Sequence, residues 1–389
     1  MPTRPRHPRV LQHVTIAVFA VALVVPIAVN VFGRSGFMAE NRRPEPPPTF
    51  ALDLDTLAQF PAAFERWFGD RFGLRDVLVR LHARLLVQGL RVSPSPSVVL
   101  GRDGWMYLAT DYTMIDYRRL APFPRPLLTR WVESLEGADR WLRARGSRLV
   151  VVIAPNGQTI YPEYVPRSYN RLHRPSRLGQ LARHLASSPV EFVDLRRLLR
   201  DAKARERVWH MTDSHWNDRG AFVASQAVIE RVRTFLPAVP PLGRDAYEAR
   251  EALDLGGDLT GMLGLRDVLL ERHQRLIPRR PPRARPAEAN VAFDPGKLDV
   301  WAHPSATEID DPAAPRAVMF RDSFGTAMMP FLSERFRRIV YVTGYRLDPE
   351  IIARERPDVV ILEIVERRLL VVDPVEDVAR AQMAPAQTP

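Results

Sequence analysis

The stretch 318-VMFRDSFGTAMMPFL-332 decides the fold of this chain. Its first residues are apolar, as in a buried strand, and a helical segment follows a tight turn around Asp322. Ser323 is therefore expected after the carboxyl end of a strand and at the start of a helix. Open α/β sheets build their functional sites at that edge, so the stretch predicts a parallel sheet and a candidate nucleophile together.

Short apolar runs alternate with helical patterns on both sides of this stretch. The proline-rich region 236–315 is expected to be irregular, and a strand pair is expected over 98–109. Helices are expected between the strands, including 177–186 and 218–235. Buried strands that alternate with helices indicate an α/β fold, a parallel sheet with helices on both faces. We expect its strands at residues 148–155, 190–195, 316–320, 338–343 and 358–365.

Ser323 has two interpretations from its own stretch. Its hydroxyl can project from the turn as a nucleophile, with its backbone N–H at the helix N-terminus placed to stabilise an oxyanion. Alternatively, its side chain can simply cap the helix, as serine often does. Gly325 leaves room for a close approach to the turn. Because a serine is a poor nucleophile until a base takes its proton, the first interpretation requires a base elsewhere in the chain.

The stretch 208-VWHMTDSHWNDRGAF-222 can supply that base. Asp213 and His215 stand two residues apart, so one short loop can carry both the base and the carboxylate that orients it. The alternative is that His215 is a buried structural histidine and Asp213 caps the following helix. Asn217 and Asp218 are better placed as caps, which favours the catalytic interpretation.

The amino-acid composition excludes several kinds of functional site. The chain has 389 residues and no cysteine, which excludes disulfides, cysteine nucleophiles and thiolate metal sites. A metal site formed by His210, Asp213 and His215 is an alternative, but its spacing matches no common site, and we expect no metal and no cofactor. The net charge of +11 comes mostly from scattered arginines. We therefore expect no nucleic-acid partner, and an anionic polysaccharide or lipid fits the charge at least as well.

The N-terminal segment predicts attachment to a membrane. Residues 10–33 carry no formal charge and are long enough to span a bilayer as one transmembrane helix, which would be a signal anchor. A cleaved signal peptide is the alternative, although its apolar region is usually shorter. Since arginines precede the segment, residues 1–9 are expected in the cytoplasm and the rest in the periplasm, outside the bacterial inner membrane. A proline-rich linker (34–50), one main domain (51–375) and a disordered tail (376–389) are expected to follow.

The serine and histidine stretches together resemble the alginate O-acetyltransferase family of the AlgJ and AlgX type, whose catalytic domain is similar to the SGNH hydrolases. The resemblance implies that Ser323 is the nucleophile, His215 the general base and Asp213 its partner, in the rearranged order of that family. Since the chain ends soon after this domain, the AlgJ type is closer than the AlgX type with its extra carbohydrate-binding domain. The resemblance covers about residues 60–368 and also rests on FPAAFERWFGDRFGLR (60–75), GRDGWMYL (101–108), IAPNGQTIYPEYVP (153–166), GGDLTGMLGL (256–265) and PDVVILEIVERRL (357–369).

Two positions depart from the family pattern. Arg321 stands where a glycine usually begins the serine motif, and no lysine follows Asn156 where relatives often carry one. Arg321 can tune the turn electrostatically and is kept as a candidate side chain at the oxyanion or substrate. Asn156 is a candidate second oxyanion donor at the end of its strand. Trp216 and Tyr161 are candidate substrate contacts, with packing under the following loop as the alternative for Tyr161.

The resemblance implies an O-acetyltransferase that modifies an exported polysaccharide through an acetyl-serine intermediate. It also implies a membrane-bound O-acyltransferase partner that supplies the acetyl group, with the lipid bilayer and the polysaccharide acceptor as further partners. A carbohydrate acetyl-esterase with the same triad is one alternative. A non-catalytic polysaccharide-binding or export scaffold protein is the other.

Overall fold

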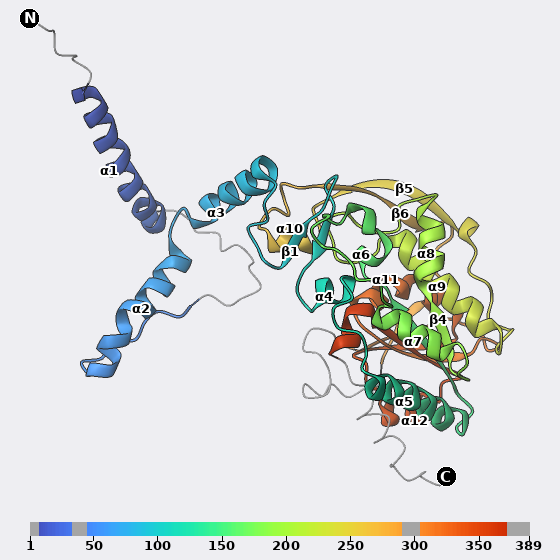
Figure 1. Cartoon of the computed structure of the whole chain (residues 1–389). Coiled ribbons are helices and arrows are strands. Elements are labelled where there is room, and N and C mark those ends of the chain that lie inside the picture. The colour runs from blue at the N-terminus through green and yellow to red at the C-terminus, as the bar shows by residue number, and fades with distance from the viewer. Residues whose placement is uncertain (1–7, 33–44, 290–303, 372–389) are drawn as a thin grey trace, which may run out of the picture. The chain divides into compact units, whose positions relative to one another are not determined.

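The computed structural model describes three parts of the chain, residues 8–32, 45–289 and 304–371 (Figure 1). The expected cytoplasmic N-terminus and proline-rich linker fall mostly outside these parts, and the expected tail falls outside them entirely. The chain divides into two compact units, residues 1–95 with 261–265, and residues 96–260 with 266–389.

The first unit is helical. The side chain of Asp53 caps one of its helices, α2, by accepting a hydrogen bond from the Thr56 amide at 2.8 Å. Helix α1 covers most of the segment expected to cross a membrane, yet within the described ranges no helix combines the length and apolar character of a membrane span. The prediction of a transmembrane helix over 10–33 is therefore not confirmed. The elements are α1 (Pro8–Phe32), α2 (Leu54–Arg71), α3 (Arg75–Arg84) and a π-helical segment (Leu85–Leu90).

A seven-stranded sheet forms the centre of the second unit. Beyond β10, the strands β8 (Ser305–Glu308) and β7 (Arg285–Ala287) extend the sheet in antiparallel pairing. The predicted parallel sheet is confirmed for five strands and is wrong at this edge, where SATE and RPA are too short and polar to show a strand pattern. The parallel strands lie in the order β4 (Glu191–Asp194), β3 (Arg148–Ala154), β11 (Val359–Val365), β9 (Arg316–Arg321) and β10 (Arg338–Thr343).

Helices cover both faces of this sheet, as predicted. Neighbouring residues of β3, such as Val151 and Val152, are fully buried in two separate cores, because successive strand side chains point to opposite faces. One core is completed by α5 (Arg125–Arg143), α7 (Arg177–Leu185) and α12 (Pro349–Glu355). The other is completed by α6 (Gly157–Ile160), α8 (Leu195–Lys203), α9 (Asp218–Arg233) and α11 (Ser323–Leu332).

An antiparallel strand pair, β5 (Tyr247–Asp254) and β6 (Glu271–Pro278), occupies part of the region expected to be irregular. The expectation is wrong here because these strands lie largely at the surface and their charged residues hide the alternation of a half-buried strand. Helix α10 (Asp258–Met262) begins in the connection between them. The predicted strand pair near residue 100 is confirmed as β1 (Val98–Leu100) and β2 (Met106–Leu108), and the short helix α4 (Thr113–Tyr117) follows it.

Candidate active site

Ser323 is the first residue of α11 and follows β9 after a single residue. That residue, Asp322, caps the helix, because its carboxylate accepts a hydrogen bond from the Phe324 amide at 2.8 Å. The interpretation of Ser323 as the helix cap is therefore wrong. Ser323 is exposed, and its Oγ lies 2.7 Å from Nε2 of His215. The turn thus presents the hydroxyl to a base instead of using it to hold the helix.

His215 lies on a loop that its own sequence closes. Trp209 and Trp216 form an antiparallel bridge across the loop, and Asn217 caps α9 by accepting from the Gly220 amide at 3.1 Å. Between these residues Asp213 Oδ1 lies 2.7 Å from Nδ1 of His215 and also accepts from the His215 amide at 2.9 Å. The structure therefore joins the three predicted residues in one hydrogen-bonded chain, from carboxylate to imidazole to hydroxyl.

In this row of hydrogen-bonded side chains, burial and the neighbouring charges shift the pKa values in opposite directions. Burial lowers the pKa of His215, but the hydrogen bond and charge of Asp213 raise the pKa more, so the net shift is upward. Burial likewise raises the pKa of Asp213, and its hydrogen bonds to His215 and to the Asp258 amide bring that pKa well below its usual value. Asp213 is therefore held ionised beside Nδ1, where its charge favours the protonated form of the imidazole.

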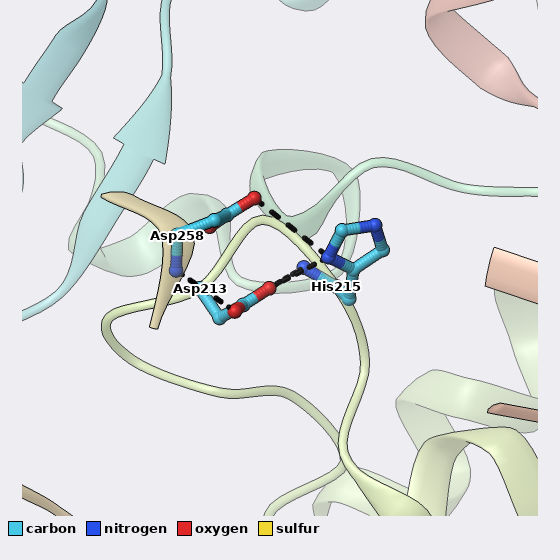
Figure 2. A group of neighbouring side chains, drawn as sticks. All are labelled: Asp213, His215 and Asp258. Carbon is cyan, nitrogen blue, oxygen red and sulfur yellow. Dashed lines mark hydrogen bonds and ion pairs between the residues drawn. The ribbon is translucent and has the colours of Figure 1, made fainter. Parts of the chain in front are cut away.

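A second carboxylate, Asp258 at the start of α10, also faces the imidazole (Figure 2). Its Oδ2 lies 3.7 Å from Nδ1 of His215 and accepts from the Ser214 hydroxyl at 2.5 Å, while its Oδ1 accepts from the Ser214 amide at 2.7 Å. Burial and the charge of Asp213 raise the pKa of Asp258. Sequence reasoning assigned this residue no role, although it stands in the stretch GGDLTGMLGL that contributes to the family resemblance.

Asp213, His215 and Asp258 offer ligand atoms that lie within 4.8 Å of one another, so they are near enough to hold a metal ion. His210 is not among them, and its Nδ1 lies 3.3 Å from Oε1 of Glu271. The alternative metal site of His210, Asp213 and His215 is thus not formed as a group in the described residues. An ion in the observed cluster would compete with Asp213 for Nδ1 of His215.

Two buried side chains, Glu363 and Arg321, support the serine turn. Glu363 is fully buried, and its Oε2 accepts from the amides of Asp322 at 3.0 Å and Gly325 at 3.2 Å. Arg321 is buried too, and it donates to the Thr326 hydroxyl at 2.8 Å. A Cβ on Gly325 would stand 2.6 Å from the Arg321 Cβ, so the close approach requires glycine. In this geometry the Arg321 guanidinium supports the helix turn, and its contact with substrate or oxyanion stays a prediction.

Asn156 remains a candidate oxyanion donor. Its backbone amide donates to Glu366 Oε2 at 2.8 Å, which fixes the residue just beyond β3. Its side chain is 2% exposed, and neither the oxygen nor the nitrogen of its amide has a hydrogen-bond partner in the described structure. The residue lines a small hollow together with Asp213, Ser214 and Arg367. A buried amide without a partner is costly, so its position beside the triad indicates a use there.

The two aromatic candidates lie in the core instead. Trp216 is 2% exposed, and its indole N–H donates to the Phe324 carbonyl at 3.2 Å, directly behind the nucleophile. Tyr161 is 5% exposed, its hydroxyl accepts from the Val208 amide at 3.0 Å, and burial raises its pKa to about 12. Both rings are buried in the described structure, and their contact with substrate stays a prediction. Packing is the observed role of Tyr161.

Comparisons with known proteins agree with this architecture. The model of a family described as an SGNH hydrolase-like domain, acetyltransferase AlgX, matches residues 98–332. The probable alginate O-acetylase AlgJ of Pseudomonas aeruginosa is 27% identical over 235 residues, which are 59% of this chain and 58% of that protein. The AlgJ protein of Pseudomonas putida is 30% identical over 183 residues, 44% of this chain and 43% of that protein. The chain thus spans less than two thirds of the length of these curated relatives.

A solved structure gives the same fold. PatB1 of Bacillus cereus superposes with a TM-score of 0.52 at 13% sequence identity, over 72% of this chain and 99% of that chain. At this identity the likeness shows the arrangement of the sheet and helices alone.

Proposed function

This chain belongs to the family of SGNH hydrolase-like domains of the AlgX acetyltransferase type, and we propose that it is a polysaccharide O-acetyltransferase that works through an acetylated Ser323. One observation carries the proposal. The contacts from Asp213 to His215 and from His215 to Ser323 are both 2.7 Å, so the hydroxyl, base and orienting carboxylate are already in hydrogen-bond reach. That geometry is what activation of a serine requires.

The first half-reaction would acetylate the serine. His215 Nε2 takes the proton of Ser323 while Oγ bonds to the acetyl carbonyl carbon of an ester donor, giving a tetrahedral intermediate. The bond between that carbon and the donor oxygen then breaks, and the imidazolium returns its proton to the leaving oxygen. Asp213 keeps the Nδ1–H in place throughout, because its carboxylate already accepts there.

The second half-reaction would reverse these roles with a sugar. A hydroxyl of the polysaccharide gives its proton to His215 Nε2 as its oxygen attacks the acetyl carbon. The bond to Ser323 Oγ breaks, and Oγ recovers the proton from the imidazolium. Water in place of the sugar would give hydrolysis by the same steps, so only the acceptor separates a transferase from an esterase.

The oxyanion of each tetrahedral intermediate needs hydrogen-bond donors. The amides of Asp322 and Gly325 already donate to Glu363, which leaves them committed to the turn. The donors we propose are the backbone N–H of Ser323, in the first turn of α11, and the unpartnered side-chain amide of Asn156.

We also propose that the acceptor is an exported polysaccharide, that the domain acts in the periplasm, and that a membrane-bound O-acyltransferase supplies the acetyl group. The names of the relatives, which are alginate O-acetylases, support the class of acceptor. The net charge of +11 favours an anionic polymer. The reaction itself requires the acetyl donor and the polymer on the same side of the membrane as Ser323.

The test is acetylation of the full-length purified chain by an aryl acetate ester, followed by intact mass spectrometry. We expect one acetyl adduct on the wild type and on the control Ser187→Ala, whose serine is exposed on another part of the domain, and none on Ser323→Ala. Oligosaccharides added to the acetylated protein should take up the acetyl group. Release only as free acetate would identify an esterase, and no adduct on the wild type would favour the scaffold alternative.

A further inference from the structure

We infer that Asp258 is a positioning residue of this site, a second carboxylate that acts on the imidazole of His215 beside Asp213. The inference rests on the proposed function, because it concerns the same acyl transfer. Figure 2 shows the two carboxylates on the Nδ1 side of the ring, with Nε2 pointing away from both. Nε2 is the atom that contacts Ser323. Both carboxylates therefore act on the Nδ1 side of the imidazole, opposite the Nε2 atom that contacts Ser323.

The two carboxylates differ in their distance from Nδ1. Asp213 Oδ1 lies 2.7 Å away and takes the hydrogen bond, whereas Asp258 Oδ2 lies 3.7 Å away. At 3.7 Å a nitrogen and an oxygen are too far apart for a hydrogen bond, but two charges still attract strongly where water is partly excluded. Asp258 thus contributes charge rather than a bond to the imidazole.

Asp258 also fixes the loop that carries the dyad. Its own amide donates to Asp213 Oδ2 at 2.9 Å, and its carboxylate accepts from the amide and the hydroxyl of Ser214, the residue between Asp213 and His215. A Cβ on Gly257 would stand 2.4 Å from the Asp213 Cβ, so glycine before Asp258 lets the two segments meet. One residue therefore sets both the position of Asp213 and the path of the backbone to His215.

Two of the charged groups near the imidazole shift its pKa upward, and a third shifts it downward. Asp213 and Asp258 each raise the pKa of His215, and Arg367 lowers it. Asp258 itself faces the charges of Asp213 and His215 and the hydroxyl of Ser214. Removing the charge of Asp258 should therefore leave the imidazolium less stable, whatever happens to the backbone of the loop.

The test compares the wild type with Asp258→Asn, which keeps an oxygen that can accept from Ser214. We expect the rate constant for acetylation of Ser323 by the aryl ester to fall about 10- to 100-fold, on the scale of a small misplacement of a catalytic group. KM for the ester should stay unchanged. The acid limb of the pH profile, and the pKa of His215 from a histidine NMR titration, should both move to lower pH.

The matched control is Asp254→Asn, the same change at the last residue of β5, four residues before Asp258. The Asp254 carboxylate binds His273 and Arg275 and has no recorded contact with the dyad, so this variant should keep the wild-type rate and profile. Ser214→Ala is a second probe, which removes the hydroxyl that donates to Asp258 and lies 3.4 Å from Nδ1 of His215, and it should give a smaller loss than Asp258→Asn. It also serves if Asp258→Asn fails to fold.

Three outcomes would overturn the inference: a wild-type rate in Asp258→Asn, an equal loss in Asp254→Asn, or an unmoved pKa of His215. The NMR titration needs no turnover. If the wild type formed no acetyl-serine, the proposed function would fail, while the titration would still decide whether Asp258 acts on the imidazole.

Discussion

The two halves of the candidate site each rely on a pair of carboxylates, but they use them differently. On the histidine loop, Asp213 and Asp258 both lie within 3.7 Å of Nδ1 of His215. On the serine turn, Asp322 and Glu363 accept from backbone amides around Ser323. The carboxylates on the first side therefore act on the imidazole of His215, and those on the second side hold the shape of the turn through hydrogen bonds.

The histidine side and the serine side also differ in how deeply a carboxylate is buried. The side chain of Asp213 is 22% exposed, whereas Glu363 is fully buried. A carboxyl group removed from water is tolerated only when hydrogen bonds compensate for the lost hydration, and two amides do so for Glu363. We therefore expect substitutions on the histidine side to lower activity first, and substitutions on the serine side to lower stability first.

Asp213→Asn should give the largest effect. The amide cannot hold Nδ1–H as the carboxylate does, so the imidazole adopts the wrong tautomer, and the rate of serine acetylation should fall about 10⁴-fold, as in other serine triads. The thermal unfolding midpoint should change little. Rates with an aryl acetate, measured beside Asp254→Asn, check this, and a loss smaller than about tenfold would contradict a triad role for Asp213.

Asp322→Ala should lower the free energy of unfolding more than Asp348→Ala, the same substitution at another helix cap. Its carboxylate accepts from the Phe324 amide, the Tyr345 hydroxyl and the Val365 amide, and the substitution leaves these three donors without it. We expect a loss of about 2–4 kcal/mol in the free energy of unfolding, measured with urea.

The matched control for that loss is Asp348→Ala at the start of α12. Asp348 also caps a helix, but its recorded partners are only the amides of Glu350 and Ile351. A simple cap should cost about 1 kcal/mol. Equal losses in the two variants would show that Asp322 is no more than a cap, and the comparison between the two halves of the site would lose its basis.

Glu271→Gln tests the hydrogen bonds that hold the start of the histidine loop, at Met211 and Thr212. Glu271 accepts from the Met211 amide at 2.9 Å and the Thr212 amide at 3.0 Å, and its Oε1 lies 3.3 Å from His210 Nδ1. Burial raises its pKa, but these hydrogen bonds outweigh burial and lower the pKa from 4.5 to about 2. Since the folded pKa is depressed, Glu271 stabilises the fold above pH 4.5, and this contribution is lost as pH falls toward 2.

Glu271→Gln should accordingly destabilise the protein by about 1–3 kcal/mol at neutral pH, and the difference from wild type should close as the pH falls. Urea unfolding at several pH values measures it. Glu251→Gln, on the exposed surface of β5, is the control and should change little at any pH. A difference that persisted at pH 2 would mean that the charge of Glu271 is not what holds the loop.

The sequence predicted the parts of the molecule whose signal is local. Most of the five parallel strands are rich in apolar residues, and Asp213, His215 and Ser323 stand in short motifs whose residue types already suggest acyl transfer. The edge position of Ser323 followed from a strand that leads into a helix. Local pattern is enough here because burial of a strand and activation of a serine each restrict neighbouring residues.

The sequence did not reveal contacts that depend on how distant segments meet. Asp258 and Glu271 lie in or beside a charged surface strand pair, and no periodicity connects them to a histidine more than forty residues earlier. The burial of Trp216 and Tyr161 was not predicted either, because an aromatic ring near a site looks the same in sequence whether it is exposed or buried. Packing decides that, and packing is not local.

Glu363→Gln should give the smallest effect, and its sign separates two states of the serine turn. Burial and the charge of Asp322 raise the pKa of Glu363. Since the folded pKa is raised, the neutral form stabilises the fold at low pH, and this contribution is lost as pH rises through the folded pKa. Gln keeps a neutral oxygen for the two amides, so the variant should match the wild type within about 1 kcal/mol at low pH and gain relative stability as pH rises.

The buried guanidinium of Arg321 lies nearby, and burial lowers its pKa more than the neighbouring carboxyl groups of Glu363 and Asp322 raise it. If Glu363 were ionised and paired with Arg321, Glu363→Gln would leave an uncompensated buried charge and cost about 3–5 kcal/mol at neutral pH. Urea unfolding across pH, with the rate of Ser323 acetylation measured in parallel, distinguishes the two. A small stability change with a rate within about threefold of wild type would agree with a neutral Glu363 that shapes the turn without acting on the reaction.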